Sequence, residues 1–244
     1  MKIRLILACL FAAATVSTAA PITVWNFDSW VYPNGPSNFQ SDYTFVNPVY
    51  DLLTDTWKFD GNPGGSFWPE GVYAVAANPH DGHPYWANMS DVSGAGNMLV
   101  YNGSPEREVV WSTDVTGIAG EYYIFDFWFA NVHADSPAAL ALHLTSPDAD
   151  LALPGLVTLP GSDVGTWHHY VWEFHTPAAN FSLVFRNENV ERVGNDFAMD
   201  NLRLSAAPEP ATFAVTGIAL ILIGAAFRCR WSRKVRLMET DFRR

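Results

Sequence analysis

The chain has 244 residues, with 14 basic against 25 acidic side chains and a formal net charge of −11. Residues 20–207 alone carry five basic and 22 acidic side chains, a formal net charge of −17. This balance argues against nucleic-acid binding, which requires a basic surface. Cys9 and Cys229 lie outside this region, so no disulfide stabilises it. Its length suits a single domain with a sizeable core.

The first 19 residues have the pattern of a secretory signal peptide. Lys2 and Arg4 precede an apolar run from Leu5 to Val16, and small residues follow the run. Cleavage after Ala19 leaves small side chains at the positions that signal peptidase requires. We therefore predict export through the Sec translocon and removal of residues 1–19 by signal peptidase.

The first strand of the exported part is predicted at residues 22–28, which read into an Asn/Asp turn. From residue 29 to about residue 96 the sequence is irregular, because Pro and Gly recur throughout it. Short strands are predicted only near residues 57–59 and 72–76. Aromatic residues are dense here, and long loops of this kind either carry binding sites or cap the end of a sandwich.

From Asn97 onward the sequence alternates regularly, as strands do. Strands are predicted at residues 98–101, 108–113, 121–132, 140–145, 167–176, 181–186 and 197–205. Residues 121–132 are largely apolar on both faces, which predicts a central strand covered on both sides. In the last strand the alternation slips at Asp200 and Asn201, which predicts a β-bulge. About eight strands without a soluble helix predict an all-β, antiparallel jelly roll or β-sandwich over residues 20–207.

The C-terminal segment holds an apolar run between a Pro-Glu-Pro motif and a basic cluster. Residues 211–227 carry no charge, and as a helix they would be about 25 Å long, near the lower limit for crossing a bilayer. Five cations follow between Arg228 and Arg236, and this excess predicts a cytoplasmic tail over residues 237–244. We therefore predict one C-terminal transmembrane helix. The alternative is a buried C-terminal helix of a soluble protein.

The order of Pro208-Glu209-Pro210, the apolar run and the Arg-rich end resembles the PEP-CTERM sorting signal of Gram-negative bacteria that make exopolysaccharide. The resemblance covers residues 208–236. It implies that an exosortase-like membrane enzyme recognises and cleaves the chain near this motif. The protein would first be anchored in the inner membrane, with its C-terminus in the cytoplasm, and then reach the cell surface or the extracellular matrix. A permanent membrane anchor is the alternative.

The regular part of the domain resembles the galactose-binding-like jelly rolls, which include many carbohydrate-binding modules and adhesion domains. The most specific part of this resemblance is Gly194-Asn-Asp-Phe-Ala-Met-Asp-Asn-Leu202. It implies that an Asp of the last strand and oxygens near the first strand hold a structural calcium ion. Asp200 matches that position, and Asn26 or Asp28 would be its partner. In the alternative, Asp200 caps a turn and Asp28 is solvated.

Aromatic residues of the irregular region form a second candidate site. Sugar rings stack on exposed Trp and Tyr side chains because the C–H faces of a sugar are apolar. Trp30, Trp68 and Trp86, together with Tyr32 and Tyr85, lie beside Asn and Asp residues. They predict a non-catalytic platform for a polysaccharide, such as an exopolysaccharide. The alternative is that these rings are core residues of a structural matrix protein without a ligand.

Signals for catalysis or zinc binding are weak. Asp126 and Glu173 could form the carboxylate pair of a glycosidase, but pairs arise by chance among 22 acidic residues. His80 and His83 are two ligands where a zinc site needs three or four. We therefore expect a binding or adhesion protein rather than an enzyme.

Overall fold

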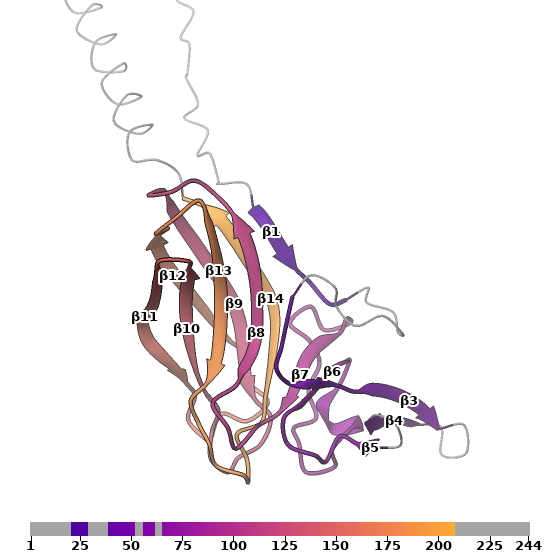
Figure 1. Ribbon diagram of the computed structural model, residues 1–244. Coiled ribbons are helices and arrows are strands. Elements are labelled where there is room, and N and C mark those ends of the chain that lie inside the picture. The colour runs from indigo at the N-terminus through magenta and orange to yellow at the C-terminus, as the bar shows by residue number, and fades with distance from the viewer. Residues whose placement is uncertain (1–20, 29–38, 52–55, 62–64, 208–244) are drawn as a thin grey trace, which may run out of the picture. The chain divides into compact units, whose positions relative to one another are not determined.

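The computed structural model (Figure 1) describes residues 21–28, 39–51, 56–61 and 65–207. Pro21–Ala207 form one compact unit. The predicted signal peptide, Pro208-Glu209-Pro210, the predicted span 211–227 and Trp30 lie outside the described residues. Within the described residues, no helix is long and apolar enough to cross a membrane.

The regular secondary structure of the described residues consists of strands, apart from one short 3-10 helix. In order they are β1 (Pro21–Trp25), β2 (Thr44–Phe45), β3 (Asn47–Asp51), β4 (Thr56–Gly61), β5 (Gly65–Ser66), β6 (Val72–Ala76), β7 (Met98–Asn102), β8 (Val109–Thr116), β9 (Tyr122–Asn131), β10 (Ala139–Ser146), β11 (Ala149–Thr158), β12 (His168–His175), β13 (Asn180–Asn187) and β14 (Phe197–Ala206). A short 3-10 helix, η1 (Pro79–Asp81), follows β6.

Two sheets face each other (Figure 1). The seven-stranded sheet has the order β12-β9-β14-β7-β6-β2, with β1 also pairing with β14. The four-stranded sheet has the order β11-β10-β13-β8, and β3, β4 and β5 form a third, small sheet. All pairs are antiparallel except β2 with β6. The all-β, antiparallel sandwich predicted from the sequence is confirmed.

Each strand predicted from Asn97 onward is present, with ends shifted by up to a few residues, but β11 was missed. β11 contains Pro154 and Gly155, and Gly155 has a φ of 105°. Both residue types normally interrupt strands. Here they are tolerated because β11 lies at the edge of the four-stranded sheet, where its pairing with β10 shifts register. β2, β3 and β5 were also missed, because they are short and lie in the irregular region.

The main core lies between the two large sheets and is rich in aromatic rings. Trp111 of β8 is fully buried, and its ring contacts those of Trp25, Phe125 and Phe185 at centroid distances of 5.2, 6.0 and 6.0 Å. Each fully buried side chain of this size contributes about 3 kcal/mol of transfer free energy. This core takes the place of the missing disulfide.

Strand β9 differs from its prediction. Its inward side chains are fully buried, but those of Tyr122, Ile124, Asp126 and Trp128 on the outer face are only half-buried. The outer face of the seven-stranded sheet is therefore covered only in part. The apolar residues on the outer face of β9 are therefore not fully buried, and the prediction that this strand is covered on both sides was wrong for that face.

The covered part of that outer face lies over β6 and β7, whose residues are all buried. A second apolar cluster forms there, in which Phe67, Trp86 and Met89 of the loops pack on Ala74 and Val100 of the sheet. The irregular region thus forms a layer on one half of the sheet. Its loops are held by packing rather than by regular secondary structure.

The predicted bulge in the last strand is confirmed. The pairing of β14 with β9 shifts between Asp200 and Arg203, and Asn201 adopts a φ of 49°, a conformation that Asn tolerates better than most residues. The shift lets Leu202 and Leu204 point into the core after Met199, and all three are fully buried. Asp200 follows the inward-pointing Met199, so its side chain lies on the opposite face of the sheet by ordinary strand alternation.

Both ends of the described domain lie at the same end of the sandwich. Pro21 pairs with Ser205, and Ala206 pairs with Tyr123. The opposite end is formed where β7 ends at Asn102 and β14 begins at Phe197. Segments that continue from the domain therefore leave it at the end remote from the loops around Asn102.

Candidate functional site

An aromatic cluster reaches from the second apolar core to the surface. Phe67 contacts the edge of Trp86 at a centroid distance of 4.8 Å, and Trp86 stacks on His83 at 4.6 Å. Trp68 covers His83 at 4.2 Å and meets Tyr85 at 6.1 Å with an interplanar angle of 83°. We call Trp68, His83 and Tyr85 the aromatic corner.

The corner presents two exposed rings. Trp68 is 52% exposed and Tyr85 72%, whereas Trp86 is only 3% exposed. Few large rings in the described part of the chain are as accessible, since most others pack in the two cores. The planes of the two rings meet at nearly a right angle.

A buried carboxylate fixes the base of the corner. Asp196 accepts hydrogen bonds from Trp86 Nε1 and from the Gly103 backbone N–H, both at 2.9 Å. Asn102 Nδ2 donates to the carbonyl oxygens of Phe67 and Trp68 at 2.8 and 3.2 Å. The loop that carries Trp68 is thus tied to the end of β7, and the loop that carries Trp86 to the start of β14.

His83 keeps the interior of the corner uncharged. Burial lowers the pKa of its imidazole to about 4, helped by the nearby His133. His83 is therefore neutral near pH 7. Its ring packs against those of Trp68 and Trp86. A neutral ring suits this position because a charged one would lose its hydration there.

Asparagine side chains hold the neighbouring loops. Asn189 Nδ2 donates to the carbonyl oxygens of Ser136 and Pro137 at 3.1 and 2.9 Å. Arg192 of the same loop lies 3.7 Å from Glu70, two residues after Trp68. Gly194 has a φ of 85°, and any Cβ there would collide with the Asp135 carbonyl. The end of the sandwich that carries the corner is therefore closely bonded.

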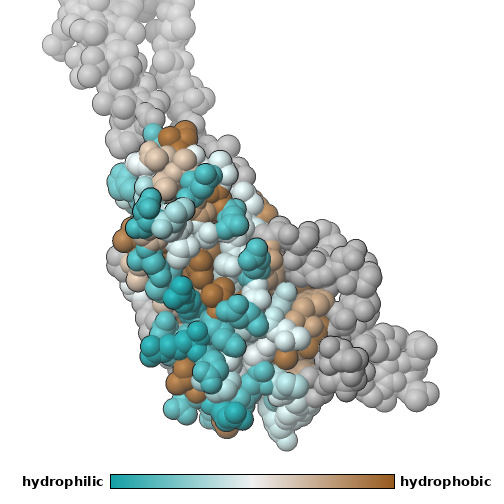
Figure 2. Space-filling view, in the orientation of Figure 1, coloured by the Kyte–Doolittle hydropathy of each residue, from teal (hydrophilic) through white to brown (hydrophobic). Residues whose placement is uncertain are grey.

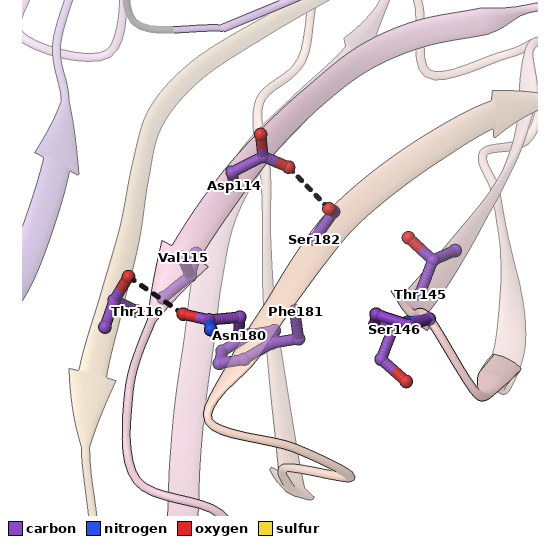
Figure 3. A pocket seen from close by; sticks show the side chains of 9 residues that line it. Asp114, Val115, Thr116, Thr145, Ser146, Asn180, Phe181 and Ser182 are labelled. Carbon is purple, nitrogen blue, oxygen red and sulfur yellow. Dashed lines mark hydrogen bonds between the residues drawn. The ribbon is translucent and has the colours of Figure 1, made fainter.

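A separate polar hollow of about 390 Å³ lies on the outer face of the four-stranded sheet (Figure 3). Its lining comprises Asp114, Val115, Thr116, Thr145, Ser146, Pro147, Asn180, Phe181 and Ser182. The Ser182 hydroxyl donates to Asp114 Oδ1 at 2.6 Å, and the Thr116 hydroxyl donates to Asn180 Oδ1 at 3.2 Å. Figure 2 shows mainly hydrophilic residues on the side of the domain in view. The hollow offers hydrogen-bonding groups but no exposed ring.

The residues implicated in calcium binding meet near the bulge. Asp200 is fully buried and accepts from the backbone N–H groups of Val92 and Asn201 at 3.1 and 2.7 Å. Burial raises the pKa of Asp200 to about 6, and the charges of Asp91 and Asp28 add to this. The structure thus brings Asp28 and Asp200 to one place and adds Asp91, which the sequence did not indicate.

This acidic cluster is already rich in hydrogen bonds. Asn26 Nδ2 donates to Asp28 at 2.8 Å, and Asp91 accepts from the Gly96 and Ser93 N–H groups at 2.8 and 2.9 Å. Among the described residues, no group of three or more His, Cys, Asp or Glu side chains is arranged to hold a metal ion. Calcium binding by Asp28 and Asp200 stays a prediction.

The residues considered for catalysis and zinc binding have separate partners. Asp126 lies 3.3 Å from His169 Nε2, whereas Glu173 accepts from the Tyr122 hydroxyl at 3.2 Å. His80 Nδ1 is 2.9 Å from the Trp86 carbonyl oxygen, whereas the His83 imidazole stacks on the ring of the same tryptophan. Among the described residues, neither pair belongs to a group of three or more side chains arranged to hold a metal ion.

The aromatic residues proposed from sequence separate into different roles. Trp68 and Tyr85 are exposed, and Trp86 is a buried support whose ring has no free face for a ligand. Trp30 and Tyr32 lie outside the described residues. Sequence reasoning missed the structural role of Asp196, although its place in the Gly-Asn-Asp-Phe segment gave the only available signal.

Several solved structures have a similar fold at low sequence identity. The tandem CBM22-1–CBM22-2 domain from Paenibacillus barcinonensis matches over 81% of this chain and 49% of its own, with 11% identity and a TM-score of 0.47. The CBM22-1 and GH10 modules of a Clostridium thermocellum endo-1,4-beta-D-xylanase, complexed with xylohexaose, match over 56% of this chain with 10% identity and a TM-score of 0.38. This chain spans 25% of that xylanase chain.

A third similar structure, the C-terminal domain of EclA, is described as a sugar-binding protein. It matches over 53% of this chain and 88% of its own, with 17% identity and a TM-score of 0.36. Similarity at this level assigns no ligand to the chain. No family model matches the sequence, and no curated protein matches it.

The buried Asp196 predicts a domain that is less stable at higher pH. Burial raises the pKa of Asp196 from 3.8 to about 7, so the folded state binds more protons than the unfolded state between these values. Stability is therefore full below about pH 4 and falls as the pH rises through 7. The raised pKa corresponds to about 4 kcal/mol. Denaturant unfolding of residues 21–207 at about pH 5 and pH 8 should show about 3 kcal/mol of this loss, which accumulates between pH 5 and pH 7, with a smaller contribution from Asp200.

Asp196→Asn should remove most of this pH dependence, because the amide does not titrate. Asp114→Asn, which changes an exposed acid, is the matched control and should leave the dependence unchanged. If Asp196→Asn and the unmodified domain lose the same free energy of unfolding between pH 5 and pH 8, the raised pKa of Asp196 is not the cause of the loss.

If Asp28 and Asp200 hold calcium, Ca²⁺ should raise the Tm of residues 21–207 and a chelator should lower it. A ligand that binds only the folded state stabilises it by about 2.7 kcal/mol at one hundred times its Kd. Calorimetry with Ca²⁺, with Mg²⁺ and with chelator measures the effect. Asp200→Asn should abolish the response and Asp114→Asn should retain it. Identical melting curves in Ca²⁺ and in chelator would show that the domain does not bind calcium.

Proposed function

We propose that this protein is an exported surface or matrix protein whose domain binds polysaccharide non-covalently at the aromatic corner. The observation that carries the proposal is the pair of exposed rings, Trp68 and Tyr85, on a base fixed by Asp196 and Asn102. Exposed rings of this size lose apolar hydration when a ligand covers them, which favours binding. A rigid base lowers the entropy that binding would otherwise cost.

The charge of the domain indicates which class of polysaccharide it would bind. A net charge of −17 over residues 20–207 repels acidic polymers at low ionic strength. Neutral polysaccharides avoid this repulsion and still stack on the two rings. We therefore expect a preference for neutral glycans, and tighter binding of acidic ones when salt screens the repulsion.

The position of the corner suits a protein attached through its termini. The described domain begins and ends at one end of the sandwich, and the corner lies at the opposite end. An anchor following Ala207 would leave the corner accessible to a polymer outside the cell. The alternatives are a structural matrix protein without a ligand and, with less support, a carbohydrate-active enzyme.

A polysaccharide pull-down and a glycan array test the binding proposal. Trp68→Ala and Tyr85→Ala should each weaken binding about tenfold or more, equivalent to about 1.4 kcal/mol, because each removes one stacking face. Trp128→Ala is the matched control, since this half-buried Trp lies on the outer face of β9. Its binding should equal that of the unmodified domain.

Three results would count against the corner as the binding site. If none of the neutral or acidic glycans binds, a structural matrix protein without a ligand is favoured. If Trp128→Ala weakens binding while Trp68→Ala does not, the ligand lies on the sheet. Turnover of a glycan that one carboxylate substitution abolishes would favour an enzyme.

We also propose that the C-terminal segment acts as a sorting signal for an exosortase-like enzyme. The support is the sequence order of Pro208-Glu209-Pro210, the uncharged run and the basic cluster. Intact-mass analysis of the protein recovered from the cell surface should give a chain that begins near Ala20 and ends near Pro208. Glu209→Ala should leave the C-terminal segment attached. A surface protein of full C-terminal length would instead indicate a permanent anchor.

A further inference from the structure

Strand β12 forms an open edge of the seven-stranded sheet. It pairs with β9 along all eight residues from His168 to His175 without a register shift. On its other side no strand follows in the sheet order. Within the described ranges, backbone hydrogen bonds outside this ladder do not involve residues 168–175. One row of N–H and C=O groups on β12 therefore has no strand beside it.

This edge has few of the features that usually prevent strand addition. Such features are charged side chains, Lys above all, and also Pro, bulges and very short strands; of these, β12 has only the acidic side chain of Glu173. The sequence His-His-Tyr-Val-Trp-Glu-Phe-His has no Lys, Arg, Pro or Gly. Val171, at its centre, is 50% exposed on the outer face. By contrast, β11 at the edge of the other sheet carries Pro154, Gly155 and a register shift.

The sequence of β12 is complementary to itself in one antiparallel register. If two copies pair with Val171 opposite Val171, each His169 faces Glu173 of the other copy on the outer side. On the inner side, each Tyr170 faces Trp172. Aromatic pairs directly across two strands stabilise a sheet by about 0.2–1 kcal/mol each, and an imidazole N–H can donate a hydrogen bond to a carboxylate. Moving the register by one residue at the centre keeps aromatic pairs on the inner side, Tyr170 with Phe174 and Trp172 with Trp172. On the outer side it places His169 opposite His175 and Val171 opposite Glu173, so only the His169–Glu173 pairs are lost.

The side chains on this face are already held in place. His169 stacks on Trp128 at 4.7 Å and lies 3.3 Å from Asp126. Glu173 accepts the Tyr122 hydroxyl at 3.2 Å. Both side chains are therefore ordered on the outer face before any partner arrives, so little further entropy is lost on pairing.

We propose that two copies of this chain associate through β12, in antiparallel register about Val171, to form one continuous sheet. The partner is a second copy because the edge complements its own sequence. An interface made of one strand on each side is small, so the dimer belongs to the weak class. Its value is bivalency, because two ligand sites on one assembly raise avidity without any new contact to the ligand.

Site-directed crosslinking in the full chain tests the register. With Cys9→Ser and Cys229→Ser in place, Val171→Cys should give a disulfide-linked dimer on mild oxidation, because the two Cα atoms would lie about 4.5–5.5 Å apart, within the range that a disulfide spans. Val24→Cys is the matched control, being 48% exposed on another strand. We expect at least about tenfold faster crosslinking at residue 171. Equal rates at the two positions would overturn the proposal.

A second pair of variants tests the edge without oxidation. Val171→Lys places two cations opposite each other in the dimer. Within one copy the new side chain lies beside Asp126, its partner on β9, so the fold should be retained. Sedimentation over a concentration series up to the millimolar range should show dimerisation for the unmodified chain and for Val24→Lys, and its loss for Val171→Lys. Persistence of the dimer in Val171→Lys, or a monomer throughout the series, would refute pairing through β12.

Discussion

The carboxylate of Asp196 connects the regular sandwich to the irregular loops. One of its oxygens binds Trp86 and the other binds the N–H of Gly103, so it bridges a loop, the end of β7 and the start of β14. A buried acid is costly unless its oxygens are paired, and here both are. Because Trp86 supports His83, and His83 supports Trp68, the exposed rings of the corner depend on this one group.

The seven-stranded sheet serves two purposes on one face. Over β6 and β7 its outer side is covered by the loops, and this second core provides the base of the aromatic corner. Over β9 and β12 the same face stays open and carries alternating aromatic, histidine and acidic side chains. The proposed glycan site and the proposed assembly edge are compatible because they lie on different parts of the sheet.

The acidic residues of the domain hold loop ends in its interior as well as contributing to its surface charge. Asp196 and Asp200 are buried near the starting half of β14, and their burial raises the pKa of both. Natural proteins keep buried acids where backbone N–H groups would otherwise be unpaired, as at Gly103, Val92 and Asn201. These acids organise loop ends, whereas exposed ones such as Asp114 contribute to the charge that a ligand meets.

The bulge at Asp200 and the strands after Asn97, except β11, could be predicted from the sequence, because period-two alternation and its interruption are local properties of the chain. The sequence also indicated the exposed Trp68, but it grouped Trp86 with it, since composition cannot tell a supporting ring from an accessible one. Three features could be seen only in the folded domain: β9 is half-buried on one side, Asp91 lies beside Asp200, and β12 is the last strand in its sheet. Each of these depends on contacts between segments far apart in the chain, which no local pattern encodes.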